Sequence, residues 1–307
     1  MPVTIGVDIG GSHISSAAVH IDTYKIIPET YFKSPVNSKT SKEEIFRKWG
    51  NVINQTLEKV KDENVMGIGI AMPGPFQYKT GIAMFEGNDK YESLHKVSIA
   101  SELPYYLNGK NLAIRFLNDA SSFGIGGALI NKIGKNQKIV ALTLGTGFGA
   151  AFLKNHVPVV NDELVPEGGC LWDKVFLDGI ADDYFSTRWF LSKYEEYTGD
   201  NNIGGVKEIV DTNSPISLKL FEEFALNFSE FMLPHLTKFD ADLLIIGGNI
   251  SKSHHLFLPA IIQKLKEKGC DISVEVIDNT DKACIIGSSY LFEPDFWNKV
   301  KEELPER

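Results

Sequence analysis

The sequence predicts an α/β fold made of two related lobes that face each other across a cleft. Beta-branched, apolar segments alternate with amphipathic ones along most of the 307 residues, a pattern typical of mixed strand-and-helix layouts. A strand, a glycine-rich turn and a second strand occur twice, so that Asp8 falls on Thr143 and Gly10 on Gly145, an offset of 135 residues. The alternative is coincidence, because hairpin turns often contain glycine.

The first series of elements runs from residue 3 to residue 131. Continuous or alternating apolar segments predict strands at residues 3–8, 14–21, 26–32, 65–72 and 112–117. Apolar residues at helical spacing, among them Ile45, Trp49 and Val52, predict a helix over residues 43–61. A second helix, residues 119–131, follows the last of these strands at once.

The second series repeats the alternation. The sequence predicts strands at residues 138–144, 149–153, 157–160, 242–246 and 272–277, and helices at residues 179–196, 217–239, 254–268 and 282–292. For residues 294–307 the sequence predicts a short polar helix and tail. Each series also contains an apolar strand that ends in glycine, at Gly74 and at Gly248. These parallels support two lobes of common design.

Composition excludes several classes of protein. The formal net charge is −9 and the pI is near 5.3, which argues against nucleic-acid binding, because that affinity comes from dense basic patches. Hydrophobic residues make up 43% and no apolar segment approaches the ~20 residues of a membrane helix. Three distant cysteines predict neither a disulfide framework nor a local zinc site. The absence of a leader-like segment after Met1 predicts a cytoplasmic protein.

Three glycine turns are candidate nucleotide contacts. Asp8-Ile9-Gly10-Gly11-Ser12 follows an apolar strand and matches neither the Rossmann nor the Walker phosphate loop. Adjacent glycines still let backbone N–H groups approach an anion, and Asp8 places a carboxylate where the Mg²⁺ of a nucleotide would lie, with water between them. The turns at residues 145–149 and 247–249 could contact phosphate and a base or ribose. Each turn alone is more often structural, and neither phosphate turn contains a lysine.

Asp119 is the candidate catalytic group. It follows the strand at residues 112–117, beside Asn118 and at the start of a helix. Asn and Asp are preferred helix caps, which is the structural interpretation. A base that orients a sugar hydroxyl and accepts its proton during phosphoryl transfer is the functional one. Both can hold if one residue of the pair caps the helix and the other reacts.

The ordered set of motifs resembles the ROK family (repressors, open reading frames and kinases) over nearly the whole chain. The motifs are Asp8-Ile9-Gly10-Gly11-Ser12, Met72-Pro73-Gly74-Pro75, Asn118-Asp119-Ala120, Gly145-Thr146-Gly147-Phe148-Gly149, Glu167-Gly168-Gly169 and Gly247-Gly248. ROK kinases, such as bacterial glucokinases and fructokinases, have the actin-like (ribonuclease H-like) ATPase fold. The resemblance therefore implies two such lobes around a central cleft, residues 1–118 completed by residues 294–307, and residues 119–293.

The resemblance also implies roles for single residues. Asp119 would be the general base, and ATP and Mg²⁺ would be the cofactors, with Asp8 holding Mg²⁺ through water. The sugar would be bound by Gly74, Asn88, Asn118, Glu167 and Asp182. The phosphates would lie against Gly10, Gly11, Ser12, Gly145, Thr146 and Gly147, and the adenosine near Gly247 and Gly248. The partners implied are a sugar substrate and further copies of the chain, as a homodimer or higher oligomer, without nucleic acid or membrane.

Three departures from the family pattern affect the sugar site. Cys170 stands where the family has a histidine that contacts sugar and zinc, the cysteine-rich zinc loop is absent, and Asp182 replaces a glutamate. A thiol is a weaker hydrogen-bond donor than imidazole, so sugar specificity is expected to shift, and Trp172 or Phe176 is a candidate to fill the space of the zinc loop. His13 stands where many members have Lys or Asn, and it is either structural or a phosphate contact.

Three functions follow from these observations. The first is an ATP-dependent sugar kinase, a glucokinase-like transferase of carbohydrate metabolism, which depends on Asp119 and both phosphate turns. The second is a sugar-binding protein that kept the fold and lost turnover, which the change at Cys170 favours. The third is a sugar-responsive transcriptional regulator. The acidic charge and the seven residues ahead of Asp8, too few for a helix-turn-helix module, oppose the third.

Overall fold

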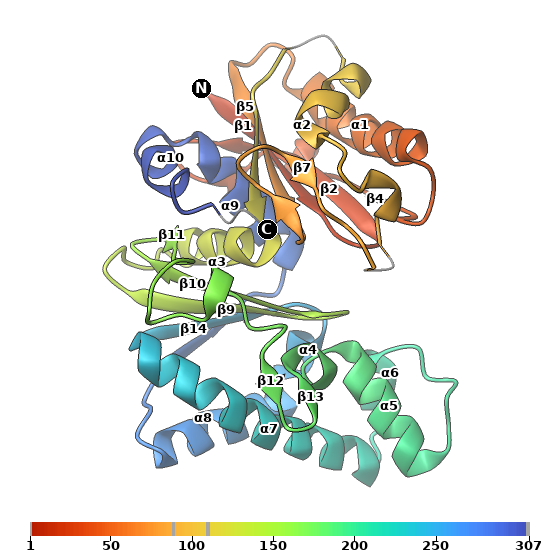
Figure 1. Cartoon of the computed structure of the whole chain (residues 1–307), viewed down its shortest axis with the longest axis vertical. Helices are drawn as coiled ribbons and strands as arrows, with labels where there is room; N and C mark the ends of the chain where they lie inside the picture. The colour runs from red at the N-terminus through yellow and green to blue at the C-terminus, as the bar shows by residue number, and fades with distance from the viewer. Residues whose placement is uncertain (1, 88–89, 109–110, 305–307) are drawn as a thin grey trace. The chain divides into compact units, whose positions relative to one another are not determined.

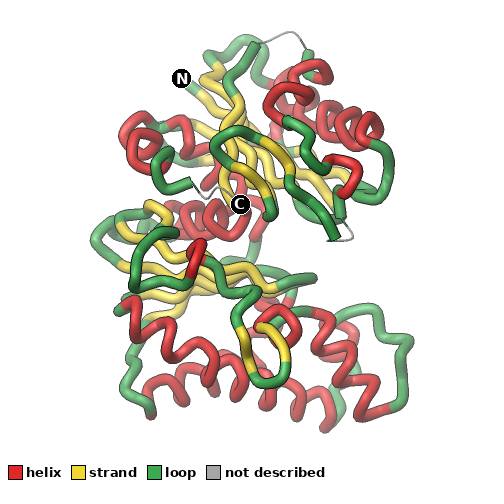
Figure 2. Tube along the Cα trace, viewed as in Figure 1, coloured by secondary structure: helices red, strands yellow, loops and turns green. Residues whose placement is uncertain are grey.

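A computed structural model describes residues 2–87, 90–108 and 111–304. The chain forms two compact units (Figure 1). The first contains the chain up to Gly134, residues 156–158 and the chain from Asp281, and the second contains residues 135–155 and 159–280. Each unit is built on one sheet, as the yellow strands of Figure 2 show. No helix among the described residues is both long enough and apolar enough to cross a membrane.

The sheet of the first unit has the strand order β3-β2-β1-β5-β8, and β4 also pairs with β2. β1 and β2 form an antiparallel hairpin, and β5 and β8 continue the sheet in parallel with β1. All seven residues of β1 are buried, so both faces of the sheet are covered. The strands of this unit are β1 (Val3–Ile9), β2 (His13–His20), β3 (Lys25–Ile26), β4 (Phe32–Pro35), β5 (Val65–Met72), β6 (Phe76–Gln77), β7 (Ile82–Ala83), β8 (Ile114–Asn118) and β11 (Val157–Pro158).

Helix α1 packs on this sheet (Figure 1). Its N-terminus is capped by Ser41, whose side chain accepts a hydrogen bond from the Glu44 N–H at 3.3 Å. Its buried face includes Phe46 and Trp49, whose rings meet edge to face at 5.6 Å. The helices of the unit are α1 (Lys42–Lys59), α2 (Ile99–Glu102), α3 (Asp119–Ile130), α9 (Thr280–Ser289) and α10 (Pro294–Val300).

Glycines allow α9 to lie directly on the first sheet and against α3. A Cβ on Gly6 would lie 2.1 Å from the Ile285 carbonyl oxygen, and one on Gly69 would lie 2.0 Å from that of Ser288. A Cβ on Gly126 of α3 would lie 1.8 Å from the carbonyl oxygen of Ala283. Backbones can approach so closely only where no side chain intervenes. The two helices therefore belong to the first unit, which differs from the boundary expected after residue 118.

The second unit has a sheet of the strand order β10-β9-β14-β15. β9 and β10 form an antiparallel hairpin, and β14 and β15 continue in parallel with β9. The elements of this unit are β9 (Lys138–Leu144), β10 (Phe148–Lys154), β12 (Val175–Phe176), β13 (Gly179–Ile180), β14 (Leu243–Gly247), β15 (Ser273–Val276), α4 (Ala181–Tyr184), α5 (Thr187–Thr198), α6 (Val206–Asp211), α7 (Pro215–Phe239) and α8 (Leu258–Glu267).

Aromatic side chains fill the core between this sheet and its helices. Phe190 of α5 packs against Phe221 and Phe224 of α7 at ring distances of 4.9 and 5.1 Å. Phe185 lies in the same core, 5.7 Å from Phe228. Figures 1 and 2 show α7 and α8 alongside each other at the edge of the unit. Large buried rings of this kind supply much of the hydrophobic stabilisation of a domain.

The two sheets repeat one topology, a hairpin followed by two parallel strands. β9 begins and ends 135 residues after β1, which is the offset found in the sequence. The turns differ, because Ile9 pairs with Ile14 in the first hairpin and Leu144 pairs with Phe148 in the second. The second turn is therefore one residue tighter.

Among the predicted elements, the following three differ most from the structure. Residues 26–32 are not one strand, because Pro28 begins a 3-10 helix, Pro28–Thr30, between β3 and β4. The helix expected over residues 179–196 is divided into α4 and α5 at Phe185 and Ser186. The helix expected from residue 254 begins only at Leu258, after a 3-10 segment, Ile250–Leu256.

Candidate active site

The first glycine turn joins β1 to β2 and carries Asp8 at its edge. The Gly10 N–H donates to the His13 carbonyl oxygen at 2.9 Å, and the Gly10 carbonyl oxygen accepts a hydrogen bond from the Tyr91 hydroxyl at 2.7 Å. Within the described part of the chain, no hydrogen bond engages the N–H groups of Gly11 and Ser12. Free N–H groups in a glycine turn can bind an anion.

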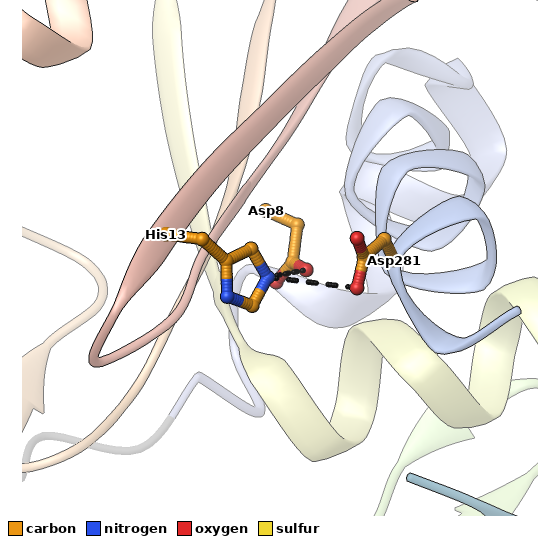
Figure 3. Close-up of side chains that lie close together, drawn as sticks. All are labelled: Asp8, His13 and Asp281. Atoms are coloured by element: carbon orange, nitrogen blue, oxygen red, sulfur yellow. Dashed lines mark ion pairs between the residues drawn. The ribbon is translucent and has the colours of Figure 1, made fainter. Parts of the chain in front are cut away.

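A charged cluster surrounds Asp8 (Figure 3). The His13 Nε2 atom lies 3.7 Å from Asp8 Oδ2 and 3.5 Å from Asp281 Oδ1. The other oxygen of Asp281 accepts hydrogen bonds from Lys33 and, at 3.4 Å, from the Tyr31 hydroxyl. Residues from β1, β2, β4 and α9 thus meet at the end of the first hairpin, although 268 positions separate His13 from Asp281.

The carboxylates of the cluster differ in their protonation. Burial raises the pKa of Asp8 to about 6, although His13 acts in the opposite direction. Burial also disfavours ionised Asp281, but His13 and Lys33 hold its pKa well below the usual range. The proximity of Asp281 and then of Asp8 raises the pKa of His13 to about 9. An imidazolium flanked by two carboxylates is the result at neutral pH.

Asn118 and Asp119 follow β8 directly and have different hydrogen-bond partners. Asn118 caps α3, because its Oδ1 atom accepts a hydrogen bond from the Ser121 N–H at 3.1 Å. Asp119 Oδ1 accepts hydrogen bonds from the Ala120 N–H at 2.8 Å and from Asn118 Nδ2 at 3.0 Å. Burial raises the pKa of Asp119, although these hydrogen bonds and Lys90 lower it. A carboxylate with a raised pKa and one oxygen held in place is suited to act as a general base.

Tyr78 connects Asn118 to the loop that contains Gly74. The Tyr78 hydroxyl donates to the Met72 carbonyl oxygen at 3.0 Å and accepts a hydrogen bond from Asn118 Nδ2 at 3.2 Å. A Cβ on Gly74 would lie 3.7 Å from the same hydroxyl. Gly74, Asn118 and Asp119 therefore lie in one place, as a shared sugar site requires. Asn88, the other sugar contact predicted in this region, falls outside the described residues.

Lys90 is a candidate binding residue that the sequence reasoning missed. A Cβ on Gly11 would lie 2.8 Å from Lys90 Cδ and 3.3 Å from its Nζ atom, so the lysine lies across the first glycine turn. Its charge also lowers the pKa of Asp119. No local pattern distinguishes Lys90 from other surface lysines, and 79 positions separate it from Gly11. The structure thus supplies the cation that neither turn contains in its own sequence.

The second glycine turn, residues 145–147, is held by Asp182 and α5. The Phe148 N–H donates to Asp182 Oδ1 at 2.6 Å, and the Gly145 carbonyl oxygen accepts hydrogen bonds from the N–H and hydroxyl of Thr187 at 2.7 and 2.9 Å. Arg188 pairs with Asp182 and donates to the Thr146 carbonyl oxygen at 3.2 Å. Asp182, predicted as a sugar contact, thus has its carboxylate committed to the turn.

Glu167 and Cys170 lie in a short 3-10 segment in which Gly168 and Gly169 both adopt positive φ. Glu167 is exposed, and the Cys170 thiol donates to its carbonyl oxygen at 3.5 Å. Burial and the neighbouring Asp173 raise the pKa of this thiol. The β12–β13 hairpin follows, with Phe176 packed against Phe185 at 5.5 Å, whereas Trp172 is half exposed.

The third glycine turn ends β14. A Cβ on Gly248 would lie 2.2 Å from the Leu144 carbonyl oxygen, and Gly248 has a φ of +97°, so no other residue fits there. Its N–H donates to Thr280 Oγ1 at 2.8 Å. The end of β14 therefore packs tightly beside the end of β9, and Gly247 and Gly248 lie close to the second glycine turn.

Comparison with known proteins identifies the family of the chain. The family model of the ROK family matches residues 4–169. A glucokinase from Thermotoga maritima is 25% identical over 85% of this chain and 86% of its own. A xylose repressor from Caldicellulosiruptor bescii is 22% identical over 92% of this chain and 76% of its own. An N-acetyl-D-glucosamine kinase from Haemophilus influenzae is 25% identical over 82% of this chain and 86% of its own.

Solved structures show the same fold. A ROK family glucokinase from Streptomyces griseus, in complex with glucose and AMPPNP, superposes with a TM-score of 0.73 at 18% identity, over 94% of this chain and 98% of its own. A ROK hexokinase from Thermus thermophilus superposes with a TM-score of 0.76 at 13% identity, over 96% of this chain and 99% of its own. The fold class is thus the actin-like two-lobe ATPase fold, as the sequence predicted. The chain belongs to the ROK family.

Proposed function

We propose that the protein transfers the γ-phosphate of ATP to a hydroxyl of a hexose or a related sugar, with Asp119 as the general base. The observation that carries this proposal is the geometry of Asp119. Both of its hydrogen bonds within the described chain fall on Oδ1, so Oδ2 is available to accept a proton. Asn118 fixes the carboxylate and caps α3 at the same time.

In this mechanism the sugar hydroxyl donates its hydrogen bond to Asp119 and transfers its proton to that carboxylate as its oxygen attacks the γ-phosphorus. The bond from this phosphorus to the bridging oxygen of the β-phosphate breaks, and ADP leaves. Asn118 lies beside Asp119 and Gly74 close to Tyr78, and we assign them to sugar binding. Glu167 and the undescribed Asn88 complete the proposed sugar contacts. For Asp182 we propose a positioning role at the second glycine turn in place of the sugar contact, because its carboxylate already holds the Phe148 N–H and Arg188.

The residues of the first unit fit a nucleotide phosphate. The free N–H groups of Gly11 and Ser12 and the Lys90 ammonium lie together at one turn, and such donors bind phosphate oxygens. In the second unit, Gly145, Thr146 and Gly147 are assigned to the phosphates, and Gly247 and Gly248 to the adenosine.

Mg²⁺ also fits, because Asp8 offers a buried carboxylate at the edge of the first turn, and Mg²⁺ is bound by one or two carboxylates together with phosphates and water. When bound, the ion would neutralise charge on the transferred phosphoryl group. Asp8 would hold the ion through water, and its burial beside His13 keeps the carboxylate in one orientation.

Sugar kinases among the relatives support a sugar substrate, and Cys170 supports an altered specificity. The relatives include a glucokinase and N-acetyl-D-glucosamine kinases. At Cys170, a thiol that donates a hydrogen bond to the Glu167 carbonyl oxygen stands where a family histidine would offer an imidazole. We therefore expect the preferred acceptor to differ from glucose at the hydroxyl or substituent that this position contacts.

An assay of sugar-dependent ADP release over hexoses, amino sugars and sugar analogues tests the proposal, with wild type beside Asp119→Asn. We expect release with at least one acceptor and its loss in the variant. Release that the variant retains would refute the assignment of Asp119. Calorimetry that detects sugar binding without ADP release for any acceptor would favour a sugar-binding protein without turnover.

A sugar-responsive regulator is the second candidate, because a xylose repressor matches 92% of this chain. A gel shift against DNA upstream of the gene separates it from the kinase. We expect no specific shift at physiological salt with or without sugar, since the net charge of −9 opposes binding to phosphate backbones. A specific shift that a sugar abolishes would establish the regulator.

A further inference from the structure

The Nε2 atom of His13 lacks a hydrogen-bond partner. It is buried and makes no hydrogen bond within the described part of the chain. It nevertheless points between two carboxylate oxygens, at 3.7 Å from Asp8 and 3.5 Å from Asp281, while the second ring nitrogen points away from both (Figure 3). Buried polar atoms nearly always have a close partner, whereas this one has only two ion pairs, both longer than a hydrogen bond.

The three side chains have the composition of a metal site. One ligand atom from each of Asp8, His13 and Asp281 lies within 4.8 Å of the others. Bonds of about 2.1 Å to a common ion would bring such atoms to within about 4 Å of one another, so the cluster needs to contract only slightly. The Asp8 side chain is 8% exposed, and the other two remain partly open for an ion to enter.

The residues behind the cluster hold it in position. Lys33 and Tyr31 both donate hydrogen bonds to Asp281 Oδ2, which leaves Asp281 Oδ1 facing His13. Partners of this kind fix the orientation of a metal ligand. A metal ion at this site would replace the proton that the His13 imidazolium carries at neutral pH. The two carboxylates, Lys33 and the neutral imidazole then leave one net negative charge around the ion, which favours a cation.

We propose that Asp8, His13 and Asp281 form a site that binds a divalent transition-metal ion, such as Co²⁺ or Zn²⁺, in preference to Mg²⁺. Imidazole is a good ligand for these ions, whereas Mg²⁺ selects oxygen ligands and retains its water. His13 sets the preference, because without it the cluster offers carboxylates alone. The inference shares one element with the proposed function, namely that a cation binds at Asp8.

The test measures metal binding to the full chain without nucleotide or sugar, so that its failure and the failure of the kinase proposal are distinguishable. Cys170 and Cys270 are partly exposed thiols that could bind Co²⁺ or Zn²⁺ themselves, so all proteins carry Cys170→Ser and Cys270→Ser. Co²⁺ is titrated by its visible spectrum, which reports the ligands, and Mg²⁺ by calorimetry. His13→Asn is compared with His20→Asn, at the opposite end of β2.

We expect one Co²⁺ site per chain, weakened more than about tenfold by His13→Asn with a change in the visible bands, and unaffected by His20→Asn. The Mg²⁺ affinity should stay equal or rise in His13→Asn, so the preference for Co²⁺ over Mg²⁺ should decrease. Asp281→Asn should also weaken Co²⁺, with circular dichroism to check its fold. Equal Co²⁺ binding by wild type and His13→Asn, no Co²⁺ binding, or an equal loss in His20→Asn would overturn the proposal.

Discussion

The two glycine hairpins have the same strand order and differ in what surrounds their turns. At the first, Asp8 and Asp119 are carboxylates whose pKa values burial raises, and a histidine nitrogen has no hydrogen-bond partner. At the second, the Asp182 carboxylate holds the Phe148 N–H and the Arg188 guanidinium. Polar side chains at the first hairpin can therefore still bind a ligand, whereas the Asp182 carboxylate at the second hairpin is already hydrogen-bonded within the protein.

We attribute different roles to the two hairpins on the basis of this difference. A carboxylate that is desolvated without a full set of partners costs stability and gains reactivity, which is typical of functional sites. A carboxylate that fixes a backbone turn contributes stability and holds donors ready for a ligand. On this account the first hairpin and α3 carry out the reaction, and the second hairpin is a preformed binding surface. Four predictions test the division.

The largest expected effect is on catalysis by Asp119→Asn. Without a general base, kcat should fall by about 10²–10⁴-fold, while KM for the sugar changes little because the amide keeps the shape of the side chain. Steady-state kinetics measure both constants, with Asp182→Asn as the matched change at the other hairpin. A comparable fall in kcat in Asp182→Asn would remove the distinction between the two regions.

Asp182→Ala should instead destabilise the fold. It leaves the buried Phe148 N–H without an acceptor, which costs about 1–3 kcal/mol of unfolding free energy. Urea denaturation measures the change, and Asp271→Ala, at an exposed aspartate of the same unit, should stay within about 0.5 kcal/mol of wild type. Equal stability of Asp182→Ala and wild type would show that the hydrogen bond contributes nothing.

Asp119→Asn should raise stability at neutral pH, by about 0.5–2 kcal/mol. The pKa of Asp119 is raised in the folded state, so folding favours its protonated form, and this contribution is lost as pH rises through the folded pKa. The amide avoids the cost of a buried charge, so its advantage should appear at pH 7 and shrink in acid. Thermal unfolding across pH measures it against the exposed Asp62→Asn. A less stable Asp119→Asn at pH 7 would contradict the desolvation argument.

The smallest effect is expected at Arg188. Its side chain is 59% exposed, and exposed ion pairs contribute about 0–1 kcal/mol. Arg188→Ala should therefore lower the unfolding free energy by less than about 1 kcal/mol, as measured in urea beside Asp182→Ala. A loss larger than that of Asp182→Ala would mean that Arg188, and not the aspartate, holds the turn.

The fold was predictable where local sequence determines it. β1, β5 and β9 are apolar, β-branched segments, and the structure places them at or within one residue of the predicted bounds. The prediction of one strand at residues 26–32 failed because Pro28 interrupts the β-branched and aromatic residues of this segment. The prediction of one helix over residues 179–196 also failed, because the core position of the Phe185 ring, where the helix is divided, depends on contacts with α7.

The candidate site was predictable only in part. Asp8, Asn118 and Asp119 follow strands directly, so their placement at a sheet edge follows from local sequence. Asp281 and Lys90 reach the first hairpin from other parts of the chain, and in the sequence Asp281 is an ordinary acidic residue at the start of a helix. Asp182 was expected at the sugar, and its bond to the Phe148 N–H depends on how α4 packs beside β10.

The central claim is phosphoryl transfer to a sugar hydroxyl with Asp119 as the base. ³¹P NMR of the protein with ATP, Mg²⁺ and a panel of sugars tests it most directly, because a sugar phosphate gives its own resonance. The account predicts such a resonance with at least one sugar for wild type, at a rate reduced about 10²–10⁴-fold in Asp119→Asn. No sugar phosphate from any acceptor, or an equal rate from both proteins, would contradict it.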